Sequence, residues 1–156
     1  MQKRVGAVAR QECAENGPWL ELEGMVQVEL TSEDVAHPIE GALLPGREPG
    51  WRAADPGEQR IRLLFHEPQR LSRIWLRFAE ARANRTQEFV LRWSPDGGRS
   101  YHDIVRQQYT FSPDGATSEI EKLRVELAAV TALELTVVPD QGRGEAYASL
   151  EEWRIG

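Results

Sequence analysis

The stretch from Phe89 to Tyr101 constrains the fold of this chain more than any other part of it. Large apolar side chains occupy every second position of 89–94, the period of a strand with one buried face. Residues 95–98, Pro-Asp-Gly-Gly, then combine a fixed proline φ, a side chain that hydrogen-bonds nearby amides, and two glycines that tolerate positive φ. Extended sequence resumes at 100–105. The stretch therefore predicts a β-hairpin.

Two residues of this hairpin are predicted to be structural. The segment 94–101 resembles the Asp-box hairpin of sialidases and other β proteins. We expect Asp96 to cap the amides of the turn and Tyr101 to pack back over it. A catalytic role is disfavoured for both.

Short strand-like segments recur along the rest of the chain. A second turn signal lies at 112–116, and a long segment rich in Pro and Gly, 31–57, is expected to be irregular and either functional or stabilised by its own side chains. About eight strands spaced 8–12 residues apart, with no long helix, predict an all-β fold, an antiparallel β-sandwich of the jelly-roll type. The candidate strands are 19–23, 25–30, 60–65, 71–78, 89–94, 100–111, 123–127, 132–138 and 148–155.

Composition sets limits on the class of protein. The 156 residues suffice for one domain, which we place at 18–156, after a weakly patterned extension, 1–17, that is either flexible or helical. The extension lacks the apolar core of a signal peptide, and no apolar run is long enough to span a membrane, so a cytoplasmic location is expected. The lone Cys13 excludes an internal disulfide. A net charge of −6 without an evident basic stripe argues against duplex nucleic acid as a partner.

The order of motifs resembles the discoidin, or coagulation factor 5/8 type C, family of the galactose-binding-like superfamily. The resemblance covers about residues 19–155, and it implies a β-sandwich whose loops bind ligands at one end. The motifs that carry it are the segment 30–33, the loop 37–43 leading to Trp51, the strands 55–65 and 71–78, the hairpin 89–101, and the closing segment 148–155.

One departure from the family concerns calcium. Family members often have an Asp-Gly in the first long loop that helps to bind a structural calcium ion, whereas this chain has Leu-Leu-Pro-Gly at 43–46. Calcium requires six or more oxygen ligands, and Glu40 and Glu152 alone would form a poor cage. We therefore expect no cofactor and no metal.

Sugar-binding relatives pair an aromatic platform with planar polar groups, and the resemblance suggests where these lie. The candidate polar groups are His37 in the first long loop and Arg82, Asn84 and Arg85 in the connector after 71–78, and the candidate platforms are Tyr109 and Phe111. A solvated turn beside core aromatics would have the same composition. Gln107 and Gln108 indicate either a hydrogen-bonding surface or an exposed edge strand. Trp51, Trp75, Trp93 and Trp153 are assigned to the core.

The residues give no sign of catalysis. The three histidines are scattered, and the sequence contains no HExxH, GxSxG or phosphate-cradling glycine loop. We therefore expect a non-catalytic module that binds a carbohydrate or a similar polyol. The alternative is an intracellular protein-interaction module of the same fold. Fold resemblance does not decide between them, and no oligomeric state follows from the sequence.

Overall fold

Two very long strands organise the computed structural model, which describes residues 18–142 and 144–156. The predicted extension 1–17, with Cys13, lies outside the described residues. In chain order the elements are β1 (Val26–Leu30), the single helical turn α2 (Glu40–Leu43), β2 (Trp51–Arg52), β3 (Gln59–Ala79), β4 (Arg85–Ser94), β5 (His102–Phe111), β6 (Ser118–Val138), β7 (Ser149–Leu150) and β8 (Glu152–Ile155).

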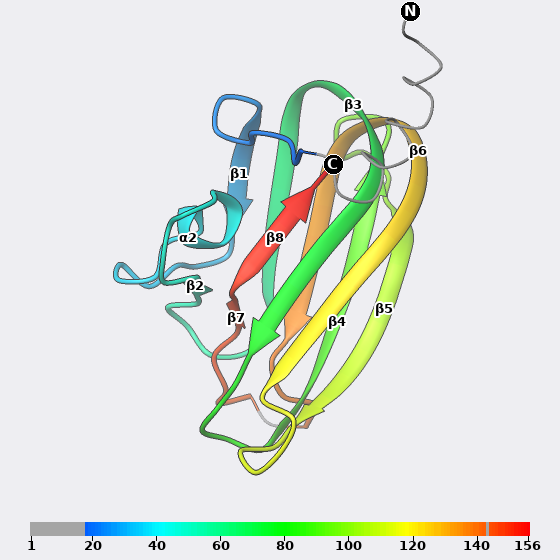
Figure 1. Ribbon diagram of the computed structural model, residues 1–156. Helices are drawn as coiled ribbons and strands as arrows, with labels where there is room; N and C mark the ends of the chain where they lie inside the picture. Colours follow the sequence, from blue (N-terminus) through cyan, green and yellow to red (C-terminus); the bar gives the residue numbers. More distant parts are fainter. Residues whose placement is uncertain (1–17, 143) are drawn as a thin grey trace, which may run out of the picture.

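Strands β3 and β6 run antiparallel to each other through both layers of a sandwich. Their register shifts between Leu64 and Arg73, and at the same point both ribbons arch over one end of the molecule (Figure 1). Before the arch β3 pairs with β1 and after it with β8, and the strand order is β1-β3-β6-β4-β5. The predicted antiparallel β-sandwich is confirmed. The segments 60–65 and 71–78, predicted as separate strands, are two halves of β3.

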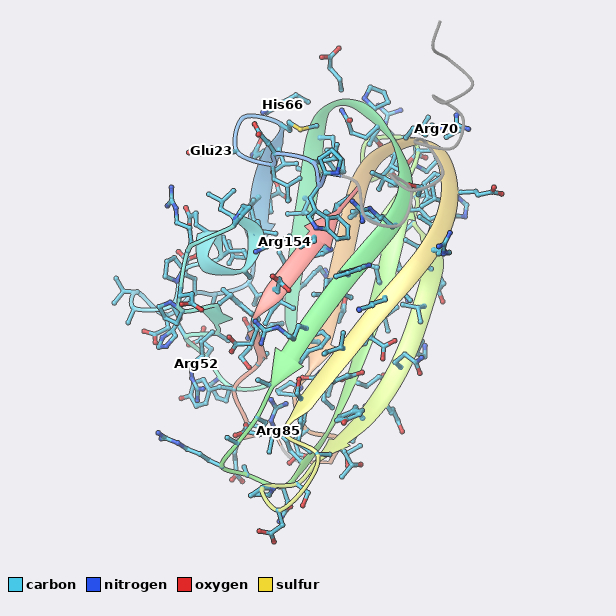
Figure 2. The ribbon with its side chains drawn as sticks, viewed as in Figure 1. Glu23, Arg52, His66, Arg70, Arg85 and Arg154 are labelled. Atoms are coloured by element: carbon cyan, nitrogen blue, oxygen red, sulfur yellow. The ribbon has the colours of Figure 1, made fainter. Side chains whose placement is uncertain are left out.

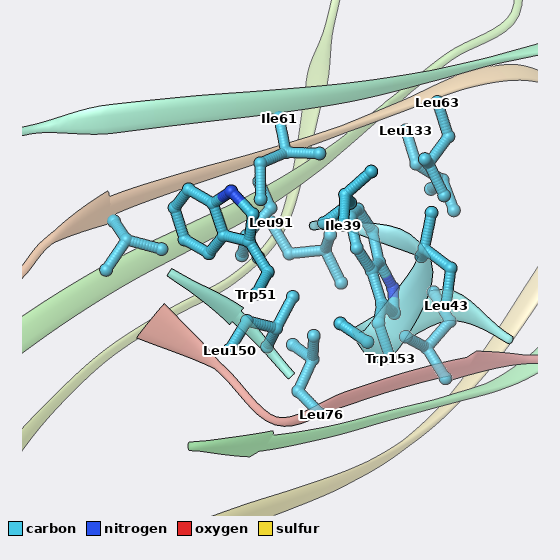
Figure 3. Close-up of a cluster of buried hydrophobic side chains, with 14 of the residues drawn as sticks. Ile39, Leu43, Trp51, Ile61, Leu63, Leu76, Leu91, Leu133, Leu150 and Trp153 are labelled. Carbon is cyan, nitrogen blue, oxygen red and sulfur yellow. The ribbon is translucent and has the colours of Figure 1, made fainter. Parts of the chain in front are cut away.

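The core lies between the two layers. Burial alternates along the first half of β3, where Ile61, Leu63 and Phe65 are buried and their neighbours are not. Side chains from β4, β6, β7, β8 and α2 fill the same space (Figure 3). Of the tryptophans assigned to the core, Trp51 and Trp153 are fully buried. Trp93 is half-buried and packs against the core, whereas Trp75 is half-buried and not part of the core cluster, which corrects its assignment.

The hairpin between β4 and β5 forms as predicted. The Asp96 carboxylate accepts hydrogen bonds from the hydroxyl and the amide of Ser100, at 2.7 and 2.9 Å, and from the hydroxyl of Ser94 at 2.7 Å. These bonds lower the pKa of Asp96 to about 2. The Tyr101 ring lies so close to Gly98, where φ is +92°, that a Cβ there would be about 3.1 Å from the phenol oxygen. Asp96 thus caps the turn and Tyr101 covers it.

The ends of the sequence fold partly as expected. The closing segment forms β7 and β8, which pair with β2 and β3. The segment 19–23 is not a strand, although the Leu20 amide donates to the Ile155 carbonyl at 2.7 Å. Within 31–57, Ser32 stabilises the irregular chain because its hydroxyl accepts from the Ala54 amide at 3.0 Å and donates to Gln59 at 2.7 Å.

Candidate functional site

Four separate segments meet at the end of the sandwich opposite the arch. They are the loop 31–39, the ribbon of β2 and β7, the loop 80–84 after β3, and the residues just before β7. Together they surround an open hollow of about 790 Å³, near which Figure 2 labels Arg52 and Arg85. Its polar and aromatic lining includes Asp34, His37, Arg52, Arg82, Tyr147 and Glu151.

His37 is held in a fixed orientation at the rim of this hollow. Its Nδ1 lies 2.8 Å from the Asp34 carboxylate, and the amide of His37 donates to the Asp34 carbonyl at 2.8 Å. The hydrogen bond with His37 lowers the pKa of Asp34. The Asp34 amide in turn donates to the Arg52 carbonyl at 2.8 Å, which ties this turn to β2. Because Nδ1 is engaged, Nε2 is the ring nitrogen that can reach a ligand.

Tyr147 supplies an aromatic surface in the hollow. Its side chain is 39% exposed, and the Arg52 guanidinium lies over the ring at 5.4 Å from its centre. A cation over one face of a tyrosine ring stabilises the ring's position. Trp51, which precedes Arg52 in β2 and also lines the hollow, is buried, and its indole N–H donates to the Ser32 carbonyl at 3.1 Å. This hydrogen bond ties β2 to the loop 31–39 beside the hollow.

The loop 80–84 is shaped by an ion pair. The Arg85 guanidinium donates to the Glu80 carboxylate at 2.9 Å, and the second carboxylate oxygen accepts from the Arg82 amide at 3.0 Å. Burial raises the pKa of Glu80, but the hydrogen bonds from Arg82 and Arg85 outweigh it, and the pKa lies below its usual value. Arg82 itself is exposed at the hollow.

Arg85 is a structural residue in this arrangement. Its side chain is nearly fully buried, its guanidinium also donates to the Pro139 carbonyl at 2.8 Å, and it lies 4.7 Å from the centre of the Phe111 ring. Phe111 is fully buried, which corrects the expectation that its ring is available as a platform. Arg85 thus lines the hollow, and the buried Phe111 ring packs against its guanidinium.

The remaining predicted site residues lie elsewhere. Asn84 lines a second, smaller hollow of about 490 Å³ beside the first, together with Thr110 and Asp140. Gln107, Gln108 and Tyr109 are on β5, which pairs with β4 alone among the described strands, and they line neither hollow. The structure thus brings His37, Arg82 and Arg85 together and leaves the β5 residues apart.

A buried polar chain continues inward from Arg85. The Arg85 guanidinium donates to the side-chain oxygen of Gln87, Oε1, at 3.2 Å, and the side-chain Nε2 of Gln87 donates to the Glu119 carboxylate at 3.1 Å. Burial, with Glu121 beside it, raises the pKa of Glu119 to about 7. Arg85 Nη2 and Glu119 Oε2 are buried and have no hydrogen-bond partner among the described residues. This chain joins the two layers directly behind the hollow.

Asp34, Arg52, Tyr147 and Glu151 line the hollow but were not predicted from the sequence. Tyr147 is an isolated aromatic in a loop of small residues, which is the one sequence signal that could have pointed to it. Within the described ranges no group of three or more His, Cys, Asp or Glu side chains could hold a metal ion. Glu152 instead lies 3.3 Å from Arg154. Among the helices of residues 18–142 and 144–156, none is long and apolar enough to cross a membrane.

In comparisons by sequence, no family model and no curated protein matches the chain. Solved structures do match in fold. A pectin-binding carbohydrate-binding module is 18% identical, with a TM-score of 0.62 over 85% of this chain and 90% of that one. A family 32 carbohydrate-binding module from Clostridium perfringens, solved with GalNAc-β-1,3-galactose, is 19% identical, with a TM-score of 0.63 over 88% and 99%.

A fucosidase from Ruminococcus gnavus, solved with fucose, has a TM-score of 0.69 at 13% identity. The match covers 97% of this chain but only 29% of the fucosidase. At such low identities these similarities show the fold alone. The chain has the β-sandwich fold that these modules share.

Proposed function

We propose that this chain is a non-catalytic carbohydrate-binding module whose ligand site is the hollow around Tyr147. The observation that carries the proposal is the convergence, from four separate segments, of an exposed aromatic ring with fixed donors and acceptors. A pyranose needs this combination, since its apolar face packs on an aromatic ring while its hydroxyls pair with planar polar groups.

Each side chain has a role that follows from its environment. Tyr147 offers the ring face that Arg52 does not cover. The Arg82 guanidinium donates to hydroxyls, whereas His37 Nε2 accepts from them because Nδ1–H donates to the Asp34 carboxylate, and Glu151 also accepts. The similar structures support a carbohydrate as the ligand class, because several are sugar-binding modules by description, but they do not bear on the roles of single residues. The finer assignment to the discoidin family rests on the order of sequence motifs.

The contacts of His37 do not favour a hydrolase of the triad type. Among the described residues, the His37 side chain is hydrogen-bonded to Asp34 and to no serine, threonine or cysteine. A hydrolase site of the triad type would need such a nucleophile beside the base.

A saccharide titration followed by tryptophan fluorescence tests the proposal, after a glycan array has identified a binding sugar. Tyr147→Ala should weaken binding about fivefold or more, since the lost packing of the ring against a sugar is worth about 1 kcal/mol or more. Gln108→Ala on β5 is the control, because Gln108 is also exposed and lies outside the hollow. Equal loss in both variants, or loss in the control alone, would reject the hollow as the site.

A protein-interaction module is the second candidate, and the free edge of β5 favours it. Arg106, Gln107 and Gln108 are exposed in a row on a strand that has one described neighbour. An open strand edge can add a strand from a partner. A partner captured by wild type but not by a Gln108→Pro variant, with no sugar bound by either, would support this alternative.

A further inference from the structure

A second hollow lies beside the hollow around Tyr147, which we now call the first hollow. The second hollow has a volume of about 490 Å³, and Ala83 and Arg85 line both hollows, so they share the loop 80–84 and the start of β4 as a common wall. The label of Arg85 marks this place at the end of the sandwich in Figure 2. Each hollow alone lies within the range of about 300–1,000 Å³ that is typical of pockets for small ligands. Because they adjoin, one extended ligand can occupy both.

The second hollow is lined by polar groups that suit sugar hydroxyls. The Thr86 and Thr110 hydroxyls lie 2.9 Å apart, and since one of them donates to the other, one hydroxyl proton stays available for a ligand. Asp140 Oδ1 accepts from the Thr86 amide at 3.2 Å, and the carboxylate has further lone pairs with which it can accept. The Asn84 side chain is exposed and carries both donors and an acceptor. None of the described residues that line this hollow is aromatic, so it offers hydrogen bonds without a ring platform.

The charge of the second hollow favours a neutral ligand. The buried Arg85 guanidinium donates to the Glu80 carboxylate at 2.9 Å, so its positive charge is already balanced. The other charged group among the described residues that line the second hollow is the Asp140 carboxylate. It would repel a carboxylate of an acidic sugar. Three arginines and three carboxylates line the first hollow, so these groups give it no net charge.

We propose that the two hollows together bind a neutral oligosaccharide of at least two sugar units. This inference rests on the proposed function, because one sugar packs on Tyr147 in the first hollow while the next sugar crosses the shared wall into the second. There its hydroxyls pair with Asn84, Thr110 and Asp140. The aromatic ring holds one unit, and the second hollow adds affinity only for a ligand long enough to reach it.

The experiment compares ligands of different length. A glycan array printed with neutral and uronic-acid saccharides of one to six units is the first probe. The best-bound oligosaccharide and the monosaccharide of the same series are then titrated by calorimetry. The length of the ligand thus becomes the variable that separates the two hollows.

The test variant is N84A/T110V, which removes an amide and a hydroxyl from the second hollow. The control is Q107A/Q108A, which removes two exposed amides from β5, the strand of Thr110, outside both hollows. Circular dichroism and thermal unfolding verify the fold of both variants. Asn84→Ala alone replaces the double variant if the double variant does not fold.

Wild type should bind a neutral di- or trisaccharide about tenfold or more tighter than the monosaccharide, because two or more hydrogen bonds are gained in the second hollow. N84A/T110V should bind the oligosaccharide about fivefold or more weaker, and the monosaccharide within about twofold of wild type. The control should stay within about twofold of wild type for both ligands. Tyr147→Ala should weaken the binding of both, because both occupy the first hollow.

The inference is overturned by equal affinity for monosaccharide and oligosaccharide, by an equal loss in the test and control variants, or by tighter binding of the uronic-acid series. It is also overturned if N84A/T110V weakens monosaccharide and oligosaccharide binding to the same extent. In each of these cases a loss of binding in Tyr147→Ala leaves the proposed function standing. No binding on the whole array, or unchanged binding in Tyr147→Ala, rejects the first hollow itself and this inference with it.

Discussion

Glu119→Gln should change how the stability of this protein depends on pH. Glu119 is only 2% exposed, between the layers, and one of its carboxylate oxygens has no hydrogen-bond partner among the described residues. Its pKa is raised from 4.5 to about 7 because burial penalises the charged form and Glu121 lies beside it. The folded protein therefore keeps a proton that the unfolded chain releases at lower pH.

The sign and size of the effect follow from this difference. Between pH 4.5 and 7 the folded state binds one more proton than the unfolded state, so each pH unit lowers the free energy of unfolding by about 1.4 kcal/mol. Over the whole window the loss is about 3 kcal/mol. The stabilising contribution is complete below pH 4.5 and absent above pH 7. The Glu119–Glu121 pair titrates as a unit, so the loss is spread over that window.

Glutamine has the shape of the protonated acid and no charge. Its carbonyl oxygen can accept from Gln87, and its amide can donate to Glu121, so the variant should match wild type near pH 5. At pH 8 it should be more stable than wild type by up to about 3 kcal/mol, or roughly 6–12 °C in Tm.

Urea unfolding of wild type and variant at pH 5, 6, 7 and 8, followed by tryptophan fluorescence, measures this difference directly. Glu126→Gln is the control, because Glu126 is an exposed carboxylate on the same strand, β6. The free energy of unfolding of Glu126→Gln, plotted against pH, should run parallel to that of wild type. The reasoning is refuted if the plot for Glu119→Gln is also parallel to wild type, or if wild type becomes more stable relative to Glu119→Gln as the pH rises.

Two further predictions each concern a single substitution and its effect on stability. Asp96→Ala should lower the Tm by a few degrees at pH 7, because the hydrogen bonds to Ser94 and Ser100 are lost. Since the pKa of Asp96 is lowered to about 2, the difference in Tm between variant and wild type should vanish as the pH falls from 3.8 through 2. Thermal scans over this pH range that show a constant difference would contradict the prediction. Gly41→Ala should lower the free energy of unfolding, measured in urea, by about 3 kcal/mol because a Cβ would overlap the Pro49 carbonyl. Gly115→Ala is the control and should be near neutral, because a Cβ at Gly115 meets no other atom. Equal effects of the two substitutions would disprove the overlap.

The hairpin could be predicted because its evidence is local. In β4 and its turn, each residue's preference agrees with the final structure, from the alternation at Phe89 to the positive φ of Gly97 and Gly98. The continuity of β3 could not be predicted in the same way. Residues 66–70 have turn-like composition, and only the partner strand β6, bending at the same place, shows that the chain arches rather than reverses.

The hollow divides along the same line. His37 and Arg82 could be predicted because polar residues in loops of a resembled family have few other roles. Tyr147 could not be predicted as a site residue, since its place in the hollow depends on contact with Arg52, which is distant in the sequence. Phe111 was misassigned because alternation in β5 does not say which aromatic faces inward at the strand end.

The placement of the buried polar chain links stability to the hollow. The other side chains that fill the space between the layers are largely apolar, yet Arg85, Gln87 and Glu119 are buried where the loop 80–84 begins. Burying charged groups with unpaired atoms opposes folding, so we infer that these three polar residues are retained because they hold a nearby loop in place. The residue they fix is Glu80, which Arg85 holds and which in turn holds the Arg82 amide at the hollow. Burial of these polar groups thus lowers the free energy of unfolding, while it holds the loop 80–84, part of the candidate site, in one conformation.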